Sequence, residues 1–204
     1  MFVSNNLPRI AMGAWAWGND GTFGSPLAAD TLRPVFDAAM KNGLTLWDTA
    51  YVYGMGQSEK TLGEFLKELP RAGYMISDKF TPQCANPKAE NAVIDLYHTS
   101  AGLLGVDFMD FYWIHNPLDA PKWTKELIPL AKSGKIGKIG LSNHSLAEIK
   151  EAEAILEQEG LEISAVQNHY SLLNRSSETS GILKYCKEHG IIFFSYMVLE
   201  QGAL

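Results

Sequence analysis

The stretch LWDTAYVYGMGQSEKTLGEFL, residues 46–66, begins with the pattern of an apolar strand and ends with that of an amphipathic helix. The turn between them holds Asp48, Tyr51 and Tyr53, a carboxylate and two phenols within six positions. Turns favour small and polar residues, so two large aromatic side chains in this place need a specific reason. The rest of the sequence indicates what that reason is.

The composition is that of an ordinary globular chain, with 204 residues, 46% of them hydrophobic and 20% charged. The net charge of -6 argues against a nucleic-acid partner, which would usually require a basic face. No apolar run approaches the roughly 20 residues of a membrane span. Cys84 and Cys186 are far apart and read as free thiols. We therefore expect a cytoplasmic protein without a nucleic-acid or membrane partner, and a site without a metal ion.

Short runs of β-branched, aromatic and other apolar residues alternate with helical patterns along the chain. In residues 30–42, apolar residues recur at helical spacing, and Gly43 is expected to end that helix. In residues 145–158, Ser145 and Glu148 have the spacing of a capping box. Seven strands are predicted, at residues 9–18, 44–50, 74–80, 107–115, 136–143, 163–170 and 191–199.

Strand–helix repetition predicts a parallel sheet, because parallel strands need a crossover between them. Two α/β architectures fit, an open doubly wound sheet and a (β/α)8 TIM-type barrel. An open nucleotide-binding sheet usually has a Gly-rich turn after its first strand, and WAWGNDGTFG at residues 15–24 has the wrong Gly spacing. A barrel is favoured because it collects the C-terminal ends of its strands around one mouth. The polar residues at those ends are Asp48, Lys79, His115, Asn143 and Gln167.

These motifs resemble those of the aldo-keto reductase family, from about Gly13 to Leu204. Residues 47–66 resemble the family's Asp-Thr-Ala-x-x-Tyr-Gly…Ser-Glu…Leu-Gly signature. Five further motifs follow in the family's order, and six motifs in the correct order make the resemblance specific. The five are SDKF (77–80), DFYWIHNP (110–117), KIGKIGLSNHS (135–145), AVQNHYSLLNR (165–175) and GIIFFSYMVLEQGAL (190–204).

Four strand-end residues make chemical sense as the machinery of carbonyl reduction. Hydride transfer to a carbonyl leaves an alkoxide, which needs a proton donor. A phenol ionises only near pH ~10, and a buried ammonium group beside it lowers its pKa. We therefore predict Tyr53 as the general acid, Lys79 as the group that lowers its pKa, and Asp48 as the anchor of Lys79. His115 would orient the carbonyl oxygen. The family resemblance implies the same four roles.

The resemblance also implies a nicotinamide cofactor, with NADP more strongly indicated than NAD. By resemblance, Ser142, Asn143 and Gln167 hold the nicotinamide carboxamide, and Tyr196 stacks on the ring. Leu199 is assigned to the same cofactor site. Asn143 has a second possible role, as the N-cap of the helix that follows it.

Aromatic residues near the predicted strand ends indicate an aromatic-walled pocket for a carbonyl or alcohol substrate. We assign Trp15, Trp17 and Tyr51 to that pocket. Trp113 is at least as well explained by a place in the core, because it alternates in phase with His115 along its strand.

Two features depart from the family. Asp78 stands where the family commonly has Thr, and by alternation it points away from Lys79, toward the helices, where an unpaired carboxylate is costly. We expect it to cap a backbone group or to bond to a helix residue. Only seven strands are predicted, whereas a barrel has eight and ~250 residues. We therefore expect residues 1–204 to form a single domain that is incomplete at its C-terminal end. Its open edges, residues 9–18 and 191–199, would favour self-association.

Three functions are compatible with this pattern. The first is an oxidoreductase that moves a hydride between NADPH, or NADH, and a carbonyl or alcohol, with Tyr53 as general acid and base. The second is a non-catalytic nucleotide-binding relative, such as a sensor or accessory subunit, or an inactive fragment. It is favoured because residues 1–204 include no counterpart of the family's segment that usually holds the adenosine phosphate of the cofactor. The third is a Schiff-base lyase that uses Lys79 as its nucleophile. The complete set of four catalytic residue types favours the first.

Overall fold

The computed structural model of the chain describes residues 7–204 and contains one seven-stranded sheet. Every strand pairs in parallel with the next strand of the chain, so the sheet order is the order of the sequence. The strands are β1 (Met12–Gly13), β2 (Leu46–Asp48), β3 (Met75–Phe80), β4 (Met109–Ile114), β5 (Ile136–Ser142), β6 (Ala165–His169) and β7 (Ile192–Tyr196).

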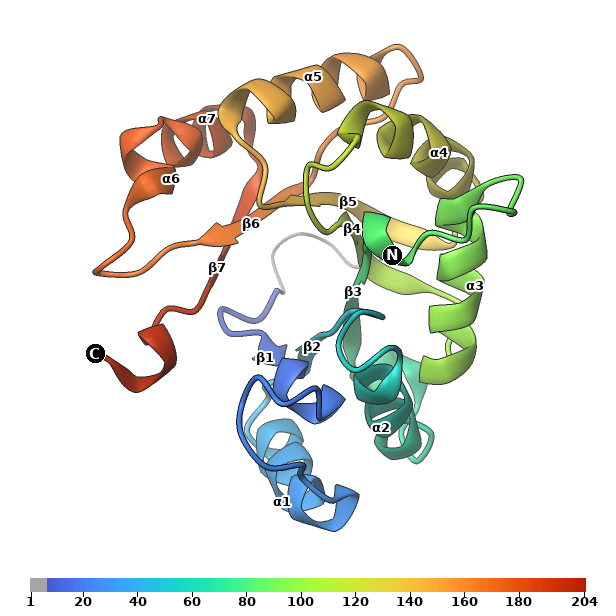
Figure 1. Cartoon of the computed structure of the whole chain (residues 1–204), viewed down its shortest axis with the longest axis vertical. Helices are drawn as coiled ribbons and strands as arrows, with labels where there is room; N and C mark the ends of the chain where they lie inside the picture. Colours follow the sequence, from blue (N-terminus) through green and yellow to red (C-terminus); the bar gives the residue numbers. More distant parts are fainter. Residues whose placement is uncertain (1–6) are drawn as a thin grey trace.

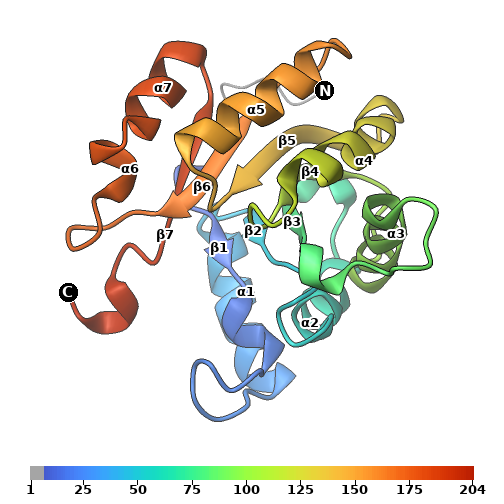
Figure 2. The same ribbon diagram turned by 45° about the horizontal axis from the view of Figure 1, so that its top comes forward.

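Helices connect the strands and follow one another around the outside of the curled sheet (Figures 1 and 2). Parallel strands joined through outer helices form the (β/α)8 barrel architecture, here with seven of its strands, and the predicted fold class is confirmed. The helices are α1 (Ala29–Lys41), α2 (Gln57–Leu66), α3 (Ala92–Leu104), α4 (Ala120–Lys132), α5 (Leu146–Glu157), α6 (Ser176–Thr179) and α7 (Ile182–His189). Short 3-10 turns complete the chain at η2 (Trp15–Gly18), η3 (Arg71–Gly73), η4 (Pro82–Cys84) and η5 (Glu200–Gly202).

Local sequence signals place the helix ends where they were expected. The helix predicted over residues 30–42 is α1, and Gly43 follows it with a positive φ of 74°, a conformation that suits glycine. The capping box of α5 is present, because the Ser145 amide donates to the Glu148 carboxylate and the Glu148 amide donates to the Ser145 hydroxyl. None of the described helices has the length and apolar character needed to cross a membrane.

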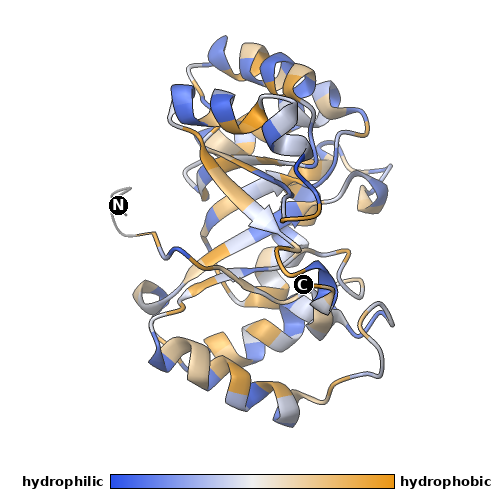
Figure 3. Cartoon of the chain, turned by 90° about the vertical axis from the view of Figure 1, so that its left-hand side faces the viewer, coloured by the Kyte–Doolittle hydropathy of each residue, from blue (hydrophilic) through white to orange (hydrophobic). Residues whose placement is uncertain are grey.

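Side-chain alternation along the strands divides the core into two layers. Outward-facing strand residues such as Trp47 and Tyr112 pack against the helices, whose surfaces alternate between hydrophobic and hydrophilic residues (Figure 3). Inward-facing residues form a smaller cluster inside the barrel, in which the ring of Phe111 stacks on that of Trp113 at 5.9 Å. Gly140 on the next strand makes room for Trp113, because a Cβ atom there would overlap the indole ring.

The first strand is much shorter than predicted. The expectation of a strand over residues 9–18 is wrong, since only Met12–Gly13 is extended and paired, and Trp15–Gly18 forms the turn η2. A close contact accounts for the difference. Gly18 lies against the turn after β2, where a Cβ atom would come within 2.5 Å of the Tyr53 carbonyl carbon.

The sheet has two free edges in the part of the chain that the structure describes. β7 pairs only with β6, and β1 only with β2, so the curl does not close between them (Figure 1). A cavity of about 640 Å³ lies in this gap, bounded by residues 7–11 on one side and 192–198 on the other. Ile10, beside β1, is 59% exposed. The open edges that the seven-strand pattern predicted are therefore present.

Candidate active site

Four side chains predicted for catalysis meet at the C-terminal ends of β2, β3 and β4. The Lys79 ammonium group donates to Asp48 Oδ1 at 2.5 Å and to the carbonyl oxygen of Thr49 at 2.7 Å, and it lies 3.3 Å from the Tyr53 hydroxyl. The ring of His115 meets the ring of Tyr53 edge to face, with centroids 5.7 Å apart. One mouth of the barrel thus gathers a carboxylate, a phenol, an ammonium group and an imidazole.

A chain of hydrogen bonds inside the barrel holds the Asp48 carboxylate in place. Its Oδ2 accepts from the Ser77 hydroxyl at 2.6 Å and from the Gln167 side-chain amide at 3.1 Å. Ser77 in turn accepts from the Trp113 indole N–H at 2.7 Å. Sequence reasoning missed the part played by Ser77, although it shares the inward face of β3 with Lys79 by simple alternation.

The turn that carries Tyr53 is packed from both sides. Gly54 and Gly56 have φ values of 68° and 92°, which few other residues adopt without strain. Gly18 of η2 lies directly against Gly54, and a Cβ atom on Gly54 would overlap the Gly18 carbonyl oxygen. The Trp15 ring stacks on the Tyr53 ring with centroids 5.4 Å apart. The phenol is therefore fixed by close backbone contact and by an aromatic wall.

Burial has the largest effect on the pKa of the Tyr53 phenol. Burial raises the pKa of Tyr53, and this outweighs the lowering by the nearby Lys79 charge, so the pKa stands above its ordinary value. Burial acts to lower the pKa of Lys79, but the charge of Asp48 and the contacts with Tyr53 raise it above the ordinary value. The predicted net lowering of the Tyr53 pKa is thus wrong, although the effect of Lys79 has the predicted direction. At neutral pH the pair is an ammonium group beside a phenol that still carries its proton.

His115 is a neutral imidazole in this setting. Burial, and then the charge of Lys79, lower the pKa of His115 to about 3. Its Nδ1 lies 2.8 Å from the hydroxyl of Thr81, a residue that sequence reasoning did not assign. When the Thr81 hydroxyl donates to Nδ1, the single ring proton of His115 resides on Nε2. The only signal for Thr81 is its position two residues after Lys79.

A cavity of about 680 Å³ opens above these groups. Asp48, Tyr53 and His115 line it, while Lys79 lies behind Tyr53 and outside the lining. All five residues assigned to the cofactor, Ser142, Asn143, Gln167, Tyr196 and Leu199, line the same cavity. Trp15 does too, and the remaining wall is mostly apolar, with Phe23, Val52, Met197 and Val198.

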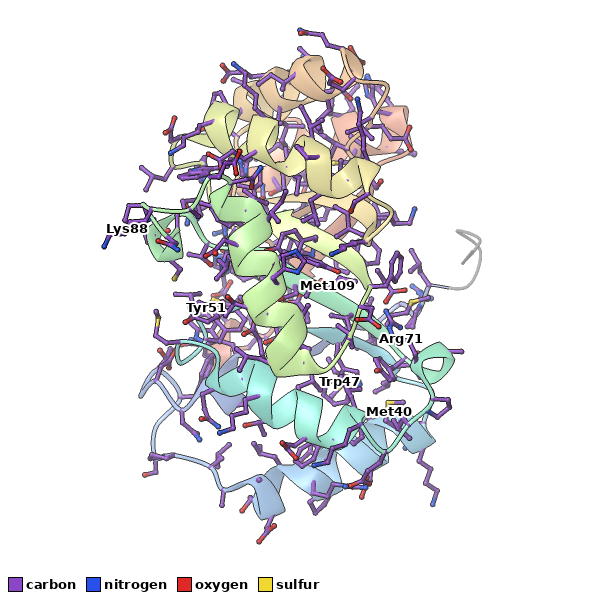
Figure 4. The ribbon with its side chains drawn as sticks, turned by 90° about the vertical axis from the view of Figure 1, so that its right-hand side faces the viewer. Met40, Trp47, Tyr51, Arg71, Lys88 and Met109 are labelled. Carbon is purple, nitrogen blue, oxygen red and sulfur yellow. The ribbon has the colours of Figure 1, made fainter. Side chains whose placement is uncertain are left out.

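Two of the three residues assigned to the substrate pocket lie elsewhere, so those assignments are wrong. Trp17 is 5% exposed and packs in the core, 5.2 Å from Trp47 between ring centroids. The turn η2 sends Trp15 toward the cavity and Trp17 toward the helices. Tyr51 lies on the helix side of the molecule (Figure 4), partly buried against the hydrophobic core and close to Gly56.

Three of the residues assigned to the cofactor, Ser142, Asn143 and Tyr196, hydrogen-bond to one another. The Asn143 side chain donates to the His115 carbonyl oxygen and to the Ser142 hydroxyl, both at 3.0 Å, and its oxygen accepts from the Tyr196 hydroxyl at 2.6 Å. Asn143 adopts a φ of 64° and does not cap α5, because Ser145 is that cap. The alternative role for Asn143 as an N-cap is therefore wrong.

The turn after β7 forms the rim of the cavity. Met197, Glu200 and Gln201 all have positive φ values there, an unusual run for residues with side chains. The Glu200 carboxylate anchors the turn, since it accepts from His169 Nε2 at 2.8 Å and from the Ser171 hydroxyl. Leu199 is 67% exposed as a result, on the cavity side of the turn. Among residues 7–204, no group of three or more His, Cys, Asp or Glu side chains could hold a metal ion.

The sequence model of the aldo/keto reductase family matches residues 9–204. An uncharacterized oxidoreductase of Mycobacterium tuberculosis is 32% identical over 204 residues, covering 97% of this chain and 60% of that protein. An NADH-specific methylglyoxal reductase of Escherichia coli is 29% identical over 219 residues, covering 97% of this chain and 65% of that protein.

The fold is also that of solved members of the same family. An aldo/keto reductase from Klebsiella pneumoniae, solved in complex with NADP and acetate, superimposes with a TM-score of 0.80 at 24% identity, covering 96% of this chain and 66% of that one. The chain spans 60% and 65% of the length of the two curated relatives named above. With a match that extends over nearly its whole length, the chain belongs to the aldo-keto reductase family.

Proposed function

We propose that the chain carries the catalytic side chains of a carbonyl reductase and the part of its site that holds the nicotinamide end of the cofactor. Tyr53 is the proton donor. The observation that carries this proposal is the 3.3 Å contact between the Tyr53 hydroxyl and the buried Lys79 ammonium group, at the edge of a cavity with a neutral imidazole beside it. When bound, NADPH supplies the hydride. The chain's own residues supply a proton, a hydrogen bond and a fixed position for the carbonyl group.

The geometry of the four side chains indicates which group donates the proton and which groups support it. As the carbonyl oxygen gains negative charge, the Tyr53 hydroxyl donates its proton to that oxygen. The Lys79 ammonium group stabilises the phenolate that remains, and Asp48 keeps Lys79 in place. His115 donates a hydrogen bond from Nε2 to the same oxygen and directs it toward Tyr53.

The protonation state of Lys79 argues against the Schiff-base lyase. A nucleophilic lysine needs a lone pair, and enzymes obtain one by lowering the lysine pKa. Although burial favours the neutral amine, the Asp48 charge holds the pKa of Lys79 above its ordinary value, and the group lies outside the cavity lining. We expect borohydride treatment with an aldehyde to trap no adduct on Lys79.

The residues around the cavity fit the nicotinamide end of a dinucleotide. Ser142, Asn143 and Gln167 offer hydroxyl and amide groups for a carboxamide, and the Tyr196 ring offers a stacking surface. We propose NADPH as the cofactor, on the family resemblance. The Klebsiella pneumoniae structure was solved with NADP, whereas the Escherichia coli relative is NADH-specific, so the test includes both dinucleotides.

NADPH is expected to bind the 204-residue chain more weakly than micromolar. No Lys or Arg lies among the described residues that line the cavity, so the phosphates of the cofactor have no cation to meet there. Each lost charge-assisted hydrogen bond costs roughly 1.5–3 kcal/mol. A fluorescence titration of the monomer measures this affinity, with reduced nicotinamide mononucleotide as the matched ligand that lacks the adenosine end. The two ligands should bind about equally, and micromolar or tighter binding of NADPH would show that a phosphate site has been missed.

An uncharged aromatic aldehyde is the substrate class to test first. The cavity wall is mostly apolar, and the side-chain charges on its described lining are those of Asp20 and Asp48, both acidic. With such a substrate and saturating NADPH, the proposal predicts one alcohol formed for each NADPH oxidised. Measurable binding of both ligands without any alcohol would instead support the non-catalytic relative.

We infer that the two free sheet edges make this chain self-associate. Exposed edge strands present unpaired N–H and C=O groups that pair with other chains. The mass measured by light scattering should therefore rise with concentration. Lysine at the two edges, in the double variant Ile10→Lys and Ser195→Lys, should keep the chain monomeric. Leu172→Lys, at a residue that is 78% exposed outside the strands, is the matched control and should behave as wild type. A monomeric wild type at high concentration would contradict the inference.

A further inference from the structure

On the other side of β3 from the Lys79 ammonium group, the buried carboxyl groups of Glu59 and Asp78 lie close enough to interact. Glu59 and Asp78 are both 0% exposed, and none of their four carboxyl oxygens forms a hydrogen bond of good geometry with another described residue. The hydroxyls of Ser100 and Tyr112 are also buried and without a partner there. Buried polar groups are nearly always hydrogen-bonded, so this cluster needs an explanation.

The cluster joins the elements that carry the catalytic residues. Asp78 is next to Lys79 on β3 and points to the opposite face, toward the helices, with Tyr112 as its register partner on β4. Glu59 lies in the first turn of α2, and Ser100 comes from α3. Glu59 thus stands at the start of the helix that directly follows the turn of Tyr53.

Two contacts place Glu59 close to the turn that carries Tyr53. A Cβ atom on Gly56, the N-cap of α2, would lie 3.6 Å from Glu59 Oε2. The Ser58 amide, one residue before Glu59, donates to the Tyr53 carbonyl oxygen at 3.2 Å. The Glu59 carboxyl group therefore lies within one helical turn of a backbone hydrogen bond to Tyr53.

In the described part of the chain, the one cation whose charge reaches both carboxyl groups is Lys79, which acts to lower both of their pKa values. The ammonium group of Lys79 is on the other face of β3 and pairs with Asp48. No other Lys or Arg of the described chain forms an ion pair with Glu59 or Asp78. Two carboxylates at this depth would repel each other at great cost, and a single shared proton removes most of that cost. The other titratable groups that face the cluster are the phenols of Tyr53, Tyr97 and Tyr112 and the thiol of Cys84.

The pKa shifts of Glu59 and Asp78 agree with a proton shared between them. Burial, and then the charge of Asp78, raise the pKa of Glu59 to about 9. Burial raises the pKa of Asp78 to about 6. Burial and both carboxyl charges raise the pKa of the Tyr112 phenol well above its ordinary value, and Tyr112 is the register partner of Asp78.

We propose that Glu59 and Asp78 hold one proton between them and act as a positioning pair for Tyr53 and Lys79. The Glu59 O–H donates to the Asp78 carboxylate and ties the start of α2 to β3. This assigns the unexpected Asp78 to a helix residue, one of the two partners anticipated for it. The tie itself depends only on the fold, and its consequence for the reaction rests on the proposed function.

Stability measured against pH tests the shared proton. Because the folded state holds the Glu59 proton up to about pH 9 and the unfolded chain releases it near 4.5, folding stability must fall as pH rises between these values. Between pH 6 and pH 9 the thermal midpoint of wild type should fall by roughly 5 °C or more relative to that of Glu59→Gln, whose amide stays neutral. Asp78→Asn should also flatten the profile. Glu64→Gln, at an exposed position of the same helix, is the matched control and should keep the wild-type slope.

Infrared spectroscopy reports the proton directly. Wild type at pH 7 should show the carbonyl stretch of a protonated carboxyl group, and Glu59→Gln should lack it. If this band is absent, or if Glu59→Gln keeps the wild-type pH slope, the proposal is wrong. It is equally wrong if Na⁺, K⁺ or Mg²⁺ raises the wild-type midpoint at pH 9 above that in tetramethylammonium chloride of equal ionic strength, because the pair would then hold a cation.

Amide hydrogen exchange tests the positioning role without any turnover. At pH 9, where wild type loses the proton, the amides of residues 50–58 should exchange faster in wild type than in Asp78→Asn. At pH 6 the two proteins should exchange at the same rate in this segment. Equal rates at both pH values would show that the pair does not hold the Tyr53 turn. Failure of carbonyl reduction alone would leave these results unchanged, so the two proposals can fail separately.

Discussion

The variant Tyr53→Phe is expected to lose carbonyl reduction by a factor of at least ~100 while keeping its fold. Phenylalanine keeps the ring that stacks on Trp15 at 5.4 Å but removes the hydroxyl beside Lys79. The developing alkoxide then loses its general acid and keeps only the hydrogen bond from the neutral His115. The measurement is the rate of NADPH oxidation with an uncharged aromatic aldehyde, in a chain competent for turnover, together with the thermal midpoint of unfolding.

Tyr51→Phe is the matched control for this variant. Tyr51 is in the same turn and loses the same hydroxyl, but it does not line the cavity. We expect its rate and its thermal midpoint to equal those of wild type. Near-normal reduction by Tyr53→Phe would remove the assignment of the general acid, whatever the behaviour of the control.

Replacing Lys79 by methionine should have the second large effect, a loss of about 3 kcal/mol in the free energy of unfolding. Lys79 is 0% exposed, and its removal leaves the Asp48 carboxylate without its counter-charge and the Thr49 carbonyl without a donor. Methionine preserves most of the volume of the lysine stem, so the loss reports the charge. Urea denaturation at neutral pH measures the change.

Two further variants distinguish loss of the Asp48–Lys79 ion pair from nonspecific destabilisation. Lys67→Met removes an exposed lysine that pairs with Glu64 and should change the free energy of unfolding by less than about 1 kcal/mol. The double variant Asp48→Asn with Lys79→Met removes both charges and should recover part of the loss. A double variant as unstable as the sum of its single changes would contradict a coupled pair.

Sequence patterns located the strand ends well because the alternation and the family motifs are local. The strand predicted over residues 74–80 is β3, Met75–Phe80, and its end carries Lys79 as expected. Parallel strands in a barrel bring such ends together, so Asp48, His115 and Gln167 could be assigned to one mouth from the sequence. The supporting contacts could not be assigned. The bond from Trp113 to Ser77 joins residues 36 positions apart and depends on the register between β3 and β4.

Side-chain directions, burial and contacts between separate elements could not be predicted from the sequence for the same reason. Trp15 and Trp17 look equivalent in the pattern, yet the turn η2 sends one to the cavity and the other to the core. The lysine beside Tyr53 suggested a lowered phenol pKa, but burial dominates and raises it. Asp78 looked anomalous because its partner Glu59 lies on a separate element, 19 positions earlier in the chain.

Transfer of a labelled hydride is the decisive test of carbonyl reduction with Tyr53 as the proton donor. The chain is incubated with NADPH in which both hydrogens at C4 of the nicotinamide are replaced by deuterium, and with an uncharged aromatic aldehyde, and the product is analysed by mass spectrometry. Wild type and Tyr51→Phe should give an alcohol with deuterium on the former carbonyl carbon, and Tyr53→Phe should give almost none. An unlabelled alcohol, or an aldehyde adduct trapped by borohydride on Lys79, would contradict the proposal.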